Sequence, residues 1–388
     1  MKQFDCVIVG GGMVGAASAL SLAELGLKVA IIERSEPIPY EPEQAYDLRV
    51  SAISLASEQL LRQLGAWQQL QQWRMCPYKR LAIWECEQSY TEFNAKNIMQ
   101  PHLGHIIENR LIQLALWQEI QQHLNIKLFC PDSLVSLEQF TTHAKLTLSS
   151  QVIEAKLVIA ADGAHSQVRK LMNIGTTGWD YAQSAMLINV KTEKPQQDIT
   201  WQQYFQTGPV AMLPMPGNSA SLVWYHEKDE INRLCSLSNR NLQGEIQQHF
   251  PTKLGKVEVV AKAAFPLTRR HANQYIKGRT ILLGDAAHTI NPMAGQGVNL
   301  GFKDVKALQS VLAEAIGNGE SWYSSSVLAK YEKKRRKDNL LMMTTMDALY
   351  LSFGHVSPIA KLARNAALSV VNKIPSIKNK ALAYACGI

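Results

Sequence analysis

The 388-residue chain lacks the sequence features of several large classes of protein. Its six cysteines are scattered and form no C-x-x-C pair, so nothing indicates a disulfide framework or a zinc site. No uninterrupted apolar run approaches the roughly 20 residues that a membrane-spanning helix needs. No charged-then-apolar leader precedes the first predicted strand, so we expect a cytoplasmic protein in a reducing compartment.

Motifs for hydrolytic or metal-dependent catalysis are also missing. The sequence contains no G-x-S-x-G nucleophile turn, no H-E-x-x-H pair and no convincing cluster of metal-ligating side chains. We therefore expect no bound metal. A second strand–helix–strand unit with its own glycine motif is absent too, so the sequence provides one dinucleotide-binding unit.

The composition is that of a folded protein, with 46% hydrophobic and 19% charged residues. The net charge of +8 is concentrated at the C-terminal end, where eleven Lys or Arg and three Asp or Glu follow from Lys330 onward. Because the rest is balanced and no nucleic-acid module is visible, we expect this end to meet an anionic membrane surface or another protein, and no nucleic acid. A solvated helical cap is the open alternative.

The N-terminal stretch FDCVIVGGGMVGAASALSLAELGLKVAIIE predicts a strand–helix–strand unit. Residues Cys6–Val9 form an apolar run typical of a buried parallel strand, and Met13–Leu25 is rich in Ala and Leu, as in a closely packed helix. Gly26 can end this helix, and Lys28–Ile32 predicts a second strand that leads to Glu33.

Three glycines in this unit form a G-x-G-x-x-G motif at Gly10, Gly12 and Gly15. The first permits a tight turn, the second lets backbone N–H groups approach a pyrophosphate, and the third lets helix pack on strand. Glu33 follows at the end of the second predicted strand, where an acidic side chain would bind a ribose hydroxyl. The unit predicts an adenine dinucleotide and leaves both NAD and FAD open.

Two later segments, Lys156–Met172 and Arg279–Leu312, each predict a strand, a loop and a helix, and we place both in the same nucleotide-binding fold. Between them the pattern changes. The stretches SAMLINVKT, TWQQYFQTGPVAMLP and SASLVWYHE predict antiparallel strands separated by Gly and Pro turns. The chain therefore predicts a β-rich domain inserted into a nucleotide-binding domain.

The three motifs together resemble those of the flavoprotein aromatic hydroxylases with the para-hydroxybenzoate hydroxylase fold. Gly10–Gly15 is similar to the first motif of that family, AADG at Ala160–Gly163 to the second, and GDAAH at Gly284–His288 to the third. The third motif favours FAD, because a nicotinamide dehydrogenase does not need Asp285 to meet a ribityl chain.

Further stretches narrow the resemblance to the ubiquinone-biosynthesis branch of this family, of UbiH/UbiF type. They are Asp47–Ser54 (DLRVSAIS), Phe265–Ala272 (FPLTRRHA) and Gly284–Val305 (GDAAHTINPMAGQGVNLGFKDV). In the inserted domain, three short stretches resemble those of family members that hydroxylate 2-octaprenyl-3-methyl-6-methoxy-1,4-benzoquinol. They are WQQY, LVWY and YAQSAMLI.

The resemblance implies an α/β, two-domain fold with a Rossmann-like FAD-binding domain, an inserted antiparallel β-sheet substrate domain and a C-terminal helical segment. We expect the FAD-binding domain to be discontinuous, at residues 1–75, 105–180 and 268–330. The substrate domain is expected at 76–104 and 181–267, and the helical region at 331–388.

It also implies a set of cofactor-binding residues. They are Gly10, Gly12, Met13, Val14, Gly15, Glu33, Arg34, Arg49, Arg110, Asp162, Gly163, Gly284, Asp285, Gly295, Gly297, Val298 and Asn299. Among these, Glu33 is expected to hold the adenosine ribose, Asp285 a ribityl hydroxyl, and Arg49 the region of flavin and pyrophosphate. Plain structural roles, such as ion pairing or helix capping, are the alternatives for these side chains.

The catalytic loop implied by the resemblance contains Pro292, Gly295, Gln296 and Gly297, whose backbone would lie against the flavin ring and stabilise its negative charge. His288 is a candidate general base, with a structural role as the favoured alternative. For the substrate, the inserted strands offer Tyr204, Met212, Pro214 and Trp224, and strand alternation predicts that about half of such candidates face elsewhere.

The implied activity is that of an FAD-dependent monooxygenase. NADPH or NADH would reduce the flavin transiently, O2 would add to give a flavin C4a-hydroperoxide, and the ring of a polyprenyl benzoquinol or phenol would be hydroxylated. A sister hydroxylase acting at another ring position is the first alternative. A flavin dehydrogenase or prenyl reductase, and a cargo-binding protein without chemistry, are the others. Other ubiquinone-biosynthesis proteins are possible partners of the basic C-terminal end.

Overall fold

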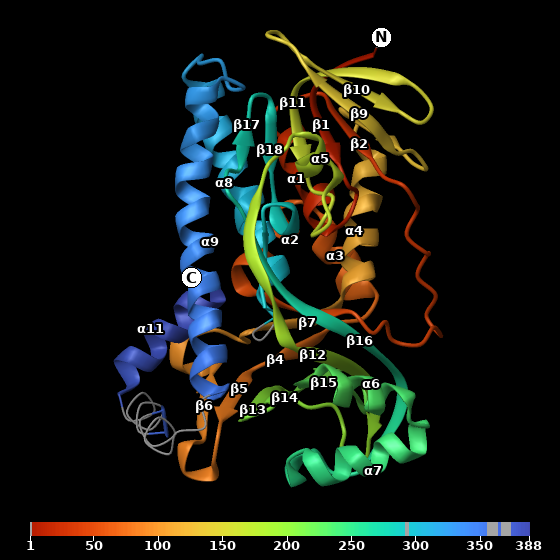
Figure 1. The fold of residues 1–388 in the computed structure, drawn as a ribbon, viewed down its shortest axis with the longest axis vertical. Coiled ribbons are helices and arrows are strands. Elements are labelled where there is room, and N and C mark those ends of the chain that lie inside the picture. Colours follow the sequence, from red (N-terminus) through yellow and green to blue (C-terminus); the bar gives the residue numbers. More distant parts are fainter. Residues whose placement is uncertain (1, 292–294, 355–363, 366–373) are drawn as a thin grey trace.

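The computed structural model describes residues 2–291, 295–354, 364–365 and 374–388, and its framework is three β-sheets (Figure 1). The first sheet has eight strands in the order β17-β18-β11-β1-β2-β8, with β10 paired to β11 and β9 to β10. Its strands are β1 (Lys2–Val9), β2 (Val29–Ile32), β8 (Ile126–Phe129), β9 (Leu134–Gln139), β10 (Ala144–Leu148), β11 (Val152–Ala160), β17 (Ile276–Lys277) and β18 (Thr280–Leu282).

The centre of this sheet is parallel, as the buried apolar runs of the sequence predict. Strand β1 pairs in parallel with both β2 and β11, and β11 pairs in parallel with β18. Helix α1 (Met13–Ala23) connects β1 to β2 and is buried along most of its length, because its Ala, Gly and Ser residues allow neighbours to approach closely. Gly26 follows with a φ of 80°, which confirms the predicted end of the helix.

The second sheet also has eight strands, in the order β19-β16-β12-β15-β14-β13-β5-β6. Its strands are β5 (Arg80–Trp84), β6 (Thr91–Asn94), β12 (Thr176–Thr192), β13 (Ile199–Phe205), β14 (Gly208–Met215), β15 (Ser219–Glu227), β16 (Val257–Ala272) and β19 (His288–Thr289). The pairs from β12 to β15, from β15 to β14 and from β14 to β13 are antiparallel, as predicted. The long strands β12 and β16 run from the nucleotide-binding half into this sheet (Figure 1).

Two helices in the inserted segment escaped the sequence analysis, which treated this region as strands alone. Helix α6 (Lys228–Ser236) and helix α7 (Asn239–His249) cover one face of the second sheet. Their buried residues Ile231, Leu234, Leu242 and Ile246 occur at helical spacing, but many polar residues separate them. Tertiary packing against the sheet therefore stabilises both helices.

The remaining elements surround these two sheets. A third sheet has the order β3-β7-β4, and helix α9 runs along one side of the molecule from the nucleotide-binding half to the second sheet (Figure 1). The elements are β3 (Val50–Ser54), α2 (Leu55–Gln63), α3 (Ala66–Gln72), β4 (Cys76–Tyr78), β7 (Gly104–Glu108), α4 (Asn109–Gln122), α5 (Gln167–Leu171), α8 (Gly297–Gly317), α9 (Ser325–Gly354) and α11 (Pro375–Cys386), with short 3-10 turns η1 (Glu87–Ser89), η2 (Ala95–Ile98), η3 (Thr252–Leu254) and η4 (Gly284–Ala286).

The two faces of the second sheet differ in what covers them. One face, with Met212 and Trp224, forms a closed core with α6 and α7. The other face, with Tyr204 and Tyr225, packs against the end of α9, where Tyr204 stacks on Phe353 at a ring distance of 3.8 Å. In the described ranges, no helix combines the length and the apolar character needed to span a membrane.

Candidate functional site

The glycine turn after β1 shows why these positions exclude side chains. Gly10 has a φ of 102°, and a Cβ there would lie 2.5 Å from the carbonyl oxygen of Ala161. A Cβ on Gly15 would lie 1.9 Å from the carbonyl oxygen of Gly10. A Cβ on Gly12, by contrast, would meet no atom of the described chain within 4 Å. Two glycines therefore serve packing, and Gly12 leaves an open surface at the helix N-terminus.

Helix α4 holds this turn in a way that the sequence analysis missed. The side chains of Gln113 and Trp117 both donate hydrogen bonds to the carbonyl oxygen of Gly11, at 2.9 and 2.7 Å. These two residues are four positions apart on one helix face. No motif marks them, and only their shared spacing could have suggested a common target.

The three sequence motifs converge on this turn. The second motif lies beside the first, since Gly10 contacts the backbone of Ala161 and Asp162. The third lies against α1, because a Cβ on Gly284 would be 3.3 Å from the side chain of Val14. Met13, Val14 and Val298 are partly buried and pack on the main core.

The loop into α8 is held by one buried amide. Asn299 accepts hydrogen bonds through Oδ1 from the Ser54 backbone at 3.0 Å and from the Ser57 hydroxyl at 2.7 Å. Its Nδ2 donates to the carbonyl oxygens of Ala52 at 2.8 Å and Gly295 at 3.2 Å. All of this amide is used inside the protein, so Asn299 positions the loop and its side chain is not free to contact a cofactor.

Other residues of that loop differ in what they expose. Gly295 has a φ of 60° and packs on Ala52, whereas a Cβ on Gly297 would meet no described atom within 4 Å. Gln296 caps α8 without a side-chain hydrogen bond to the helix. Pro292, which the resemblance placed against the flavin ring, lies outside the described residues.

Glu33 lies beside the glycine turn, at the end of β2. Its Oε2 accepts a hydrogen bond from the Gly11 backbone N–H at 2.7 Å, and its Oε1 accepts from the backbone of Arg34 at 2.7 Å and Ser35 at 3.3 Å. Oε2, which accepts one hydrogen bond, has a further lone pair for a ribose hydroxyl. The Arg34 side chain is exposed.

Two aspartates occupy the second and third motifs. Asp162 accepts through Oδ2 from the backbone of Gln167 at 2.7 Å and Val168 at 3.1 Å, and thereby caps α5. Its Oδ1 is buried and has no hydrogen-bond partner within the described ranges. Asp285 is an exposed residue within η4, and Arg49, also exposed, lies close enough to act on its charge. An arginine and a carboxylate therefore lie close together at the third motif.

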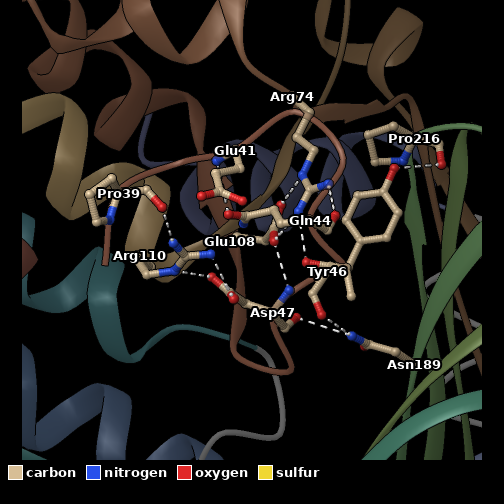
Figure 2. A network of polar contacts seen from close by, with 11 residues as sticks. Pro39, Glu41, Gln44, Tyr46, Asp47, Arg74, Glu108, Arg110, Asn189 and Pro216 are labelled. Carbon is tan, nitrogen blue, oxygen red and sulfur yellow. Dashed lines mark hydrogen bonds and ion pairs between the residues drawn. The ribbon is translucent and has the colours of Figure 1, made fainter. Parts of the chain in front are cut away.

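Arg110 does not point to this surface, contrary to the expectation that it binds the cofactor. It pairs with Asp47 at 2.9 Å and donates to the carbonyl oxygens of Ile38 and Pro39 at 2.7 and 3.0 Å (Figure 2). The Asp47 backbone N–H in turn donates to Glu108 at 2.7 Å. All these contacts hold the segment that carries Arg49, so Arg110 acts on the site through that segment.

The same segment bridges the two halves of the molecule. Arg74 binds both carboxylate oxygens of Glu108, at 2.7 and 2.8 Å, and the carbonyl oxygen of Gln44 at 2.9 Å (Figure 2). From the second sheet, Asn189 donates to the Tyr46 carbonyl at 2.9 Å, and the Tyr46 hydroxyl donates to the Pro216 carbonyl at 3.1 Å. The position of Arg49 therefore depends on both halves.

His288 is enclosed in a buried ionic cluster rather than exposed to a substrate. Its Nε2 lies 2.5 Å from Oδ2 of Asp304, which also accepts the Gly284 backbone N–H at 3.0 Å. Arg335 of α9 binds the other oxygen of Asp304 at 2.7 Å. Burial alone would raise the pKa of Asp304, but His288 and Arg335 outweigh it and hold that pKa at about 2. The geometry favours the structural alternative for His288.

The four substrate candidates do not lie together. Met212 and Trp224 are 2% and 3% exposed and belong to the closed core under α6 and α7, so we withdraw both from the candidate substrate residues. Pro214 is buried on the same strand as Met212, two positions on. Tyr204 lies on the opposite face, toward α9. The sequence pattern shows that side chains alternate between the two faces of a strand, but it does not show which face other elements cover.

One cluster of metal-ligand residue types was not anticipated. Glu58, His102 and His105 bring their ligand atoms within 4.8 Å of one another. The His102 Nε2 lies 2.7 Å from Glu58, and Arg62 donates two hydrogen bonds to the other oxygen of that carboxylate. Because a guanidinium already neutralises the carboxylate, we assign no metal to this cluster.

The chain matches the family model described as FAD binding domain over residues 3–344. It is 46% identical to 3-demethoxyubiquinol 3-hydroxylase of Escherichia coli (strain K12), over 99% of this chain and 98% of the relative. The chain belongs to the FAD-dependent hydroxylases of ubiquinone biosynthesis. This hydroxylase is also 35% identical to ubiquinone hydroxylase UbiL of Rhodospirillum rubrum, over all of this chain and 90% of that relative.

Solved structures show the same fold. The hydroxylase superposes on p-nitrophenol 4-monooxygenase PnpA from Pseudomonas putida DLL-E4 with a TM-score of 0.80 and 19% identity, covering 98% of this chain and 97% of that one. For aklavinone-11 hydroxylase in complex with FAD and aklavinone, the TM-score is 0.70 at 18% identity, covering 90% and 69%. These findings confirm the predicted fold, the monooxygenase class and FAD, and NAD(P)H is the reductant typical of the family.

The geometry of the hydroxylase fits this cofactor. At Gly12, Gly163 and Gly297, which belong to the three motif regions, an added Cβ would meet no described atom within 4 Å. Asp162, whose buried Oδ1 has no hydrogen-bond partner among the described residues, adjoins Gly163, and the exposed Asp285 adjoins Gly284. Backbone N–H groups at the start of α1 would hold the pyrophosphate, and Asp285 would accept a ribityl hydroxyl.

We expect Gly12→Ala and Gly15→Ala to have opposite consequences. The first methyl group enters open space, so the fold persists but FAD affinity falls by at least about tenfold, the equivalent of 1.4 kcal/mol. The second overlaps the Gly10 carbonyl and destabilises the protein by roughly 1–3 kcal/mol. Flavin titration and thermal unfolding measure the two effects.

The control is Gly244→Ala, at an exposed position in α7 where a Cβ meets no described atom within 4 Å. It should change neither FAD affinity nor folding adversely. Normal FAD binding by the Gly12→Ala protein would contradict our placement of the pyrophosphate.

The stability of the protein should fall as the pH drops from about 6.5 toward 4. Burial, and after it the nearby Arg336, His288 and Arg269, together lower the pKa of His271 to about 4. Because the pKa of His271 is depressed in the folded protein, the unfolded chain binds the proton more readily. Acidification below the ordinary pKa of histidine therefore lowers the free energy of unfolding, by up to about 3 kcal/mol. Urea unfolding between pH 5 and pH 8 should show a shallower slope for His271→Gln than for the wild type.

The exposed His249 provides the matched control, because His249→Gln removes a histidine at a solvated position. The slope of this variant should equal that of the wild type. Equal slopes for all three proteins would show that His271 is not the group responsible.

Proposed function

We propose that this hydroxylase inserts one oxygen atom from O2 into an open ring carbon of a polyprenyl benzoquinol, at the 2-octaprenyl-3-methyl-6-methoxy-1,4-benzoquinol step. The observation that carries the proposal is the 46% identity, over nearly the full length of both chains, to a relative named 3-demethoxyubiquinol 3-hydroxylase. That name places the relative's reaction at ring position 3, so the pathway step named from the sequence is not confirmed. A sister step at another ring position is the alternative.

The walls around the loop into α8 suit a largely apolar ring substrate. Tyr204, Tyr225 and Leu267 of the second sheet face Phe353 of α9 and form one apolar cluster. A neighbouring cluster contains Ile290, Leu300, Met342, Met343 and Met346. Methionine side chains adapt to irregular shapes, and sheltering each CH2 of a prenyl chain contributes about 0.8 kcal/mol.

The chemistry divides between the cofactor and the protein. Bound FAD supplies the electron transfer and oxygen activation. The residues at the glycine turn would hold FAD, Asn299 fixes the loop into α8, and the second sheet and α9 would cover the substrate ring. Exclusion of water by these walls would keep the oxygen from being lost as peroxide.

Incubation of the purified holoenzyme with NAD(P)H and a short-chain prenyl quinol should consume O2 in proportion to a product heavier by one oxygen atom. Mass spectrometry of the product and an oxygen electrode measure both quantities. Deletion of the gene in its host should cause the quinol one hydroxylation earlier to accumulate, which identifies the step. Turnover without oxygen in the product would instead support the dehydrogenase or reductase alternative.

We also propose that the exposed side of α9 rests on an anionic membrane surface. Lys333, Lys334 and Lys337 are exposed, and the same helix continues with Leu340 and Leu341, which are 41% and 60% exposed. Lysines next to exposed leucines are the pattern of helices that bind at the interface of a bilayer. A prenyl substrate, which partitions into lipid, would be reached from such a position.

Replacement of Lys333, Lys334 and Lys337 together by Gln should weaken binding to vesicles that contain an anionic lipid, and added salt should weaken wild-type binding. Arg335 stays unchanged, because it is buried against Asp304. The control replaces Lys127, Lys256 and Lys277, three exposed lysines elsewhere. Equal vesicle binding by both triple variants would leave α9 as a solvated cap.

A further inference from the structure

A chain of polar side chains crosses the apolar walls of the candidate substrate site. Arg269 of β16 pairs with Asp347 of α9 at 2.6 Å, and the hydroxyl of Tyr181 on β12 donates to the other oxygen of Asp347. On the far side, the Tyr225 hydroxyl lies 3.4 Å from Oδ1 of Asn291. Asn291 directly precedes the loop that leads into α8. The chain thus joins α9 to the cofactor loop.

The amide nitrogen of Asn291 lacks a hydrogen-bond partner among the described residues. Asn291 is 1% exposed, and its Nδ2 has no hydrogen-bond acceptor among the residues that the structure describes. The amide also lies beside the Tyr181 hydroxyl, but not in the geometry of a hydrogen bond. An unpaired buried amide donor costs roughly 1–3 kcal/mol. Tyr225 holds the oxygen side of the amide, so the donor side is left for another molecule.

We propose that Asn291 and Tyr181 form the subsite that binds one ring hydroxyl of the quinol, and that it selects the reduced ring over the quinone. This inference rests on the proposed function and deepens it. Asn291 Nδ2 donates a hydrogen bond to the oxygen of the ring hydroxyl. Tyr181 commits its own proton to Asp347, so its oxygen accepts the proton of that hydroxyl in a hydrogen bond.

The donor and acceptor pattern explains the selectivity. A quinol hydroxyl can accept from Asn291 and donate to Tyr181 at the same time. A quinone carbonyl can accept from Asn291 but has no proton for Tyr181. Only the reduced ring therefore satisfies both groups, and only the reduced ring is electron-rich enough to receive an oxygen atom.

Arg269 and Asp347 are positioning residues in this arrangement. Their pair is 8% and 11% exposed, and the guanidinium of Arg269 lies 4.4 Å from the ring centroid of Trp179. The Arg269 guanidinium, which can only donate, pairs with one oxygen of Asp347, and the Tyr181 hydroxyl donates to the other oxygen. These contacts fix the direction of the Tyr181 hydroxyl. They act on the quinol only through Tyr181.

Two variants of the holoenzyme separate the two contacts. Binding of a short-chain prenyl quinol and of its quinone is measured without NAD(P)H and O2, from the change in flavin absorbance. Asn291→Leu should weaken the binding of both ligands by about 10–100-fold, because both accept from the amide. Tyr181→Phe should weaken the quinol by about tenfold and leave the quinone nearly unchanged.

The matched control is Asn239→Leu, which removes an amide hydrogen bond to Val259 on the opposite face of the second sheet. It should bind both ligands as the wild type does. FAD content and the flavin spectrum, measured for each variant, report any damage to the cofactor site that could mimic a loss of quinol binding.

The proposal is overturned if Asn291→Leu, with FAD retained, binds quinol as tightly as the wild type. It is also overturned if Tyr181→Phe weakens quinol and quinone equally. Failure of the proposed function gives a different result: the wild type would bind the quinol selectively yet form no oxygenated product.

Discussion

Close contact between backbones at a few glycines is the constraint on which the site depends. Gly10 and Gly15 bring the first strand, the first helix and the backbone of Ala161 to distances that no Cβ would permit. Gly301 does the same between α8 and α1, since a Cβ there would lie 2.5 Å from Val14. Segments almost 300 residues apart in the chain thus meet at one turn. The open surface for the cofactor exists because these contacts fix its edges.

The sequence was sufficient for the parts of the fold that local pattern determines. The glycine spacing, the apolar runs and Gly26 predicted β1, α1 and β2 closely, and the third motif distinguished FAD from NAD. The direction in which each side chain points could not be predicted from the sequence. Asn299 looks like a cofactor ligand in a motif, yet every polar atom of its amide is used by neighbouring protein groups. Arg110 similarly belongs to a set of partners that only folding brings together.

The inserted sheet shows a related limit. Alternation along β14 and β15 predicts two faces but does not say that α6 and α7 cover the one with Met212 and Trp224. These helices carry few apolar residues, so their formation depends on the sheet that they cover. The other face of the sheet packs against α9, a helix that lies far from these strands in the sequence. Residues such as Tyr181, Asp347 and Asn291 belong to three separate elements, and no sequence motif links them.

The buried pairing of Arg335 with Asp304 gives the C-terminal region a role in the interior of the protein. Asp304 holds the Gly284 backbone, and it is accompanied by a positive charge supplied from α9. A chain shortened ahead of that arginine would leave the buried Asp304 without its guanidinium partner, next to the turn that carries Asp285. We therefore expect the docking of α9, a helix that contains none of the nucleotide-binding motifs, to support the binding of FAD.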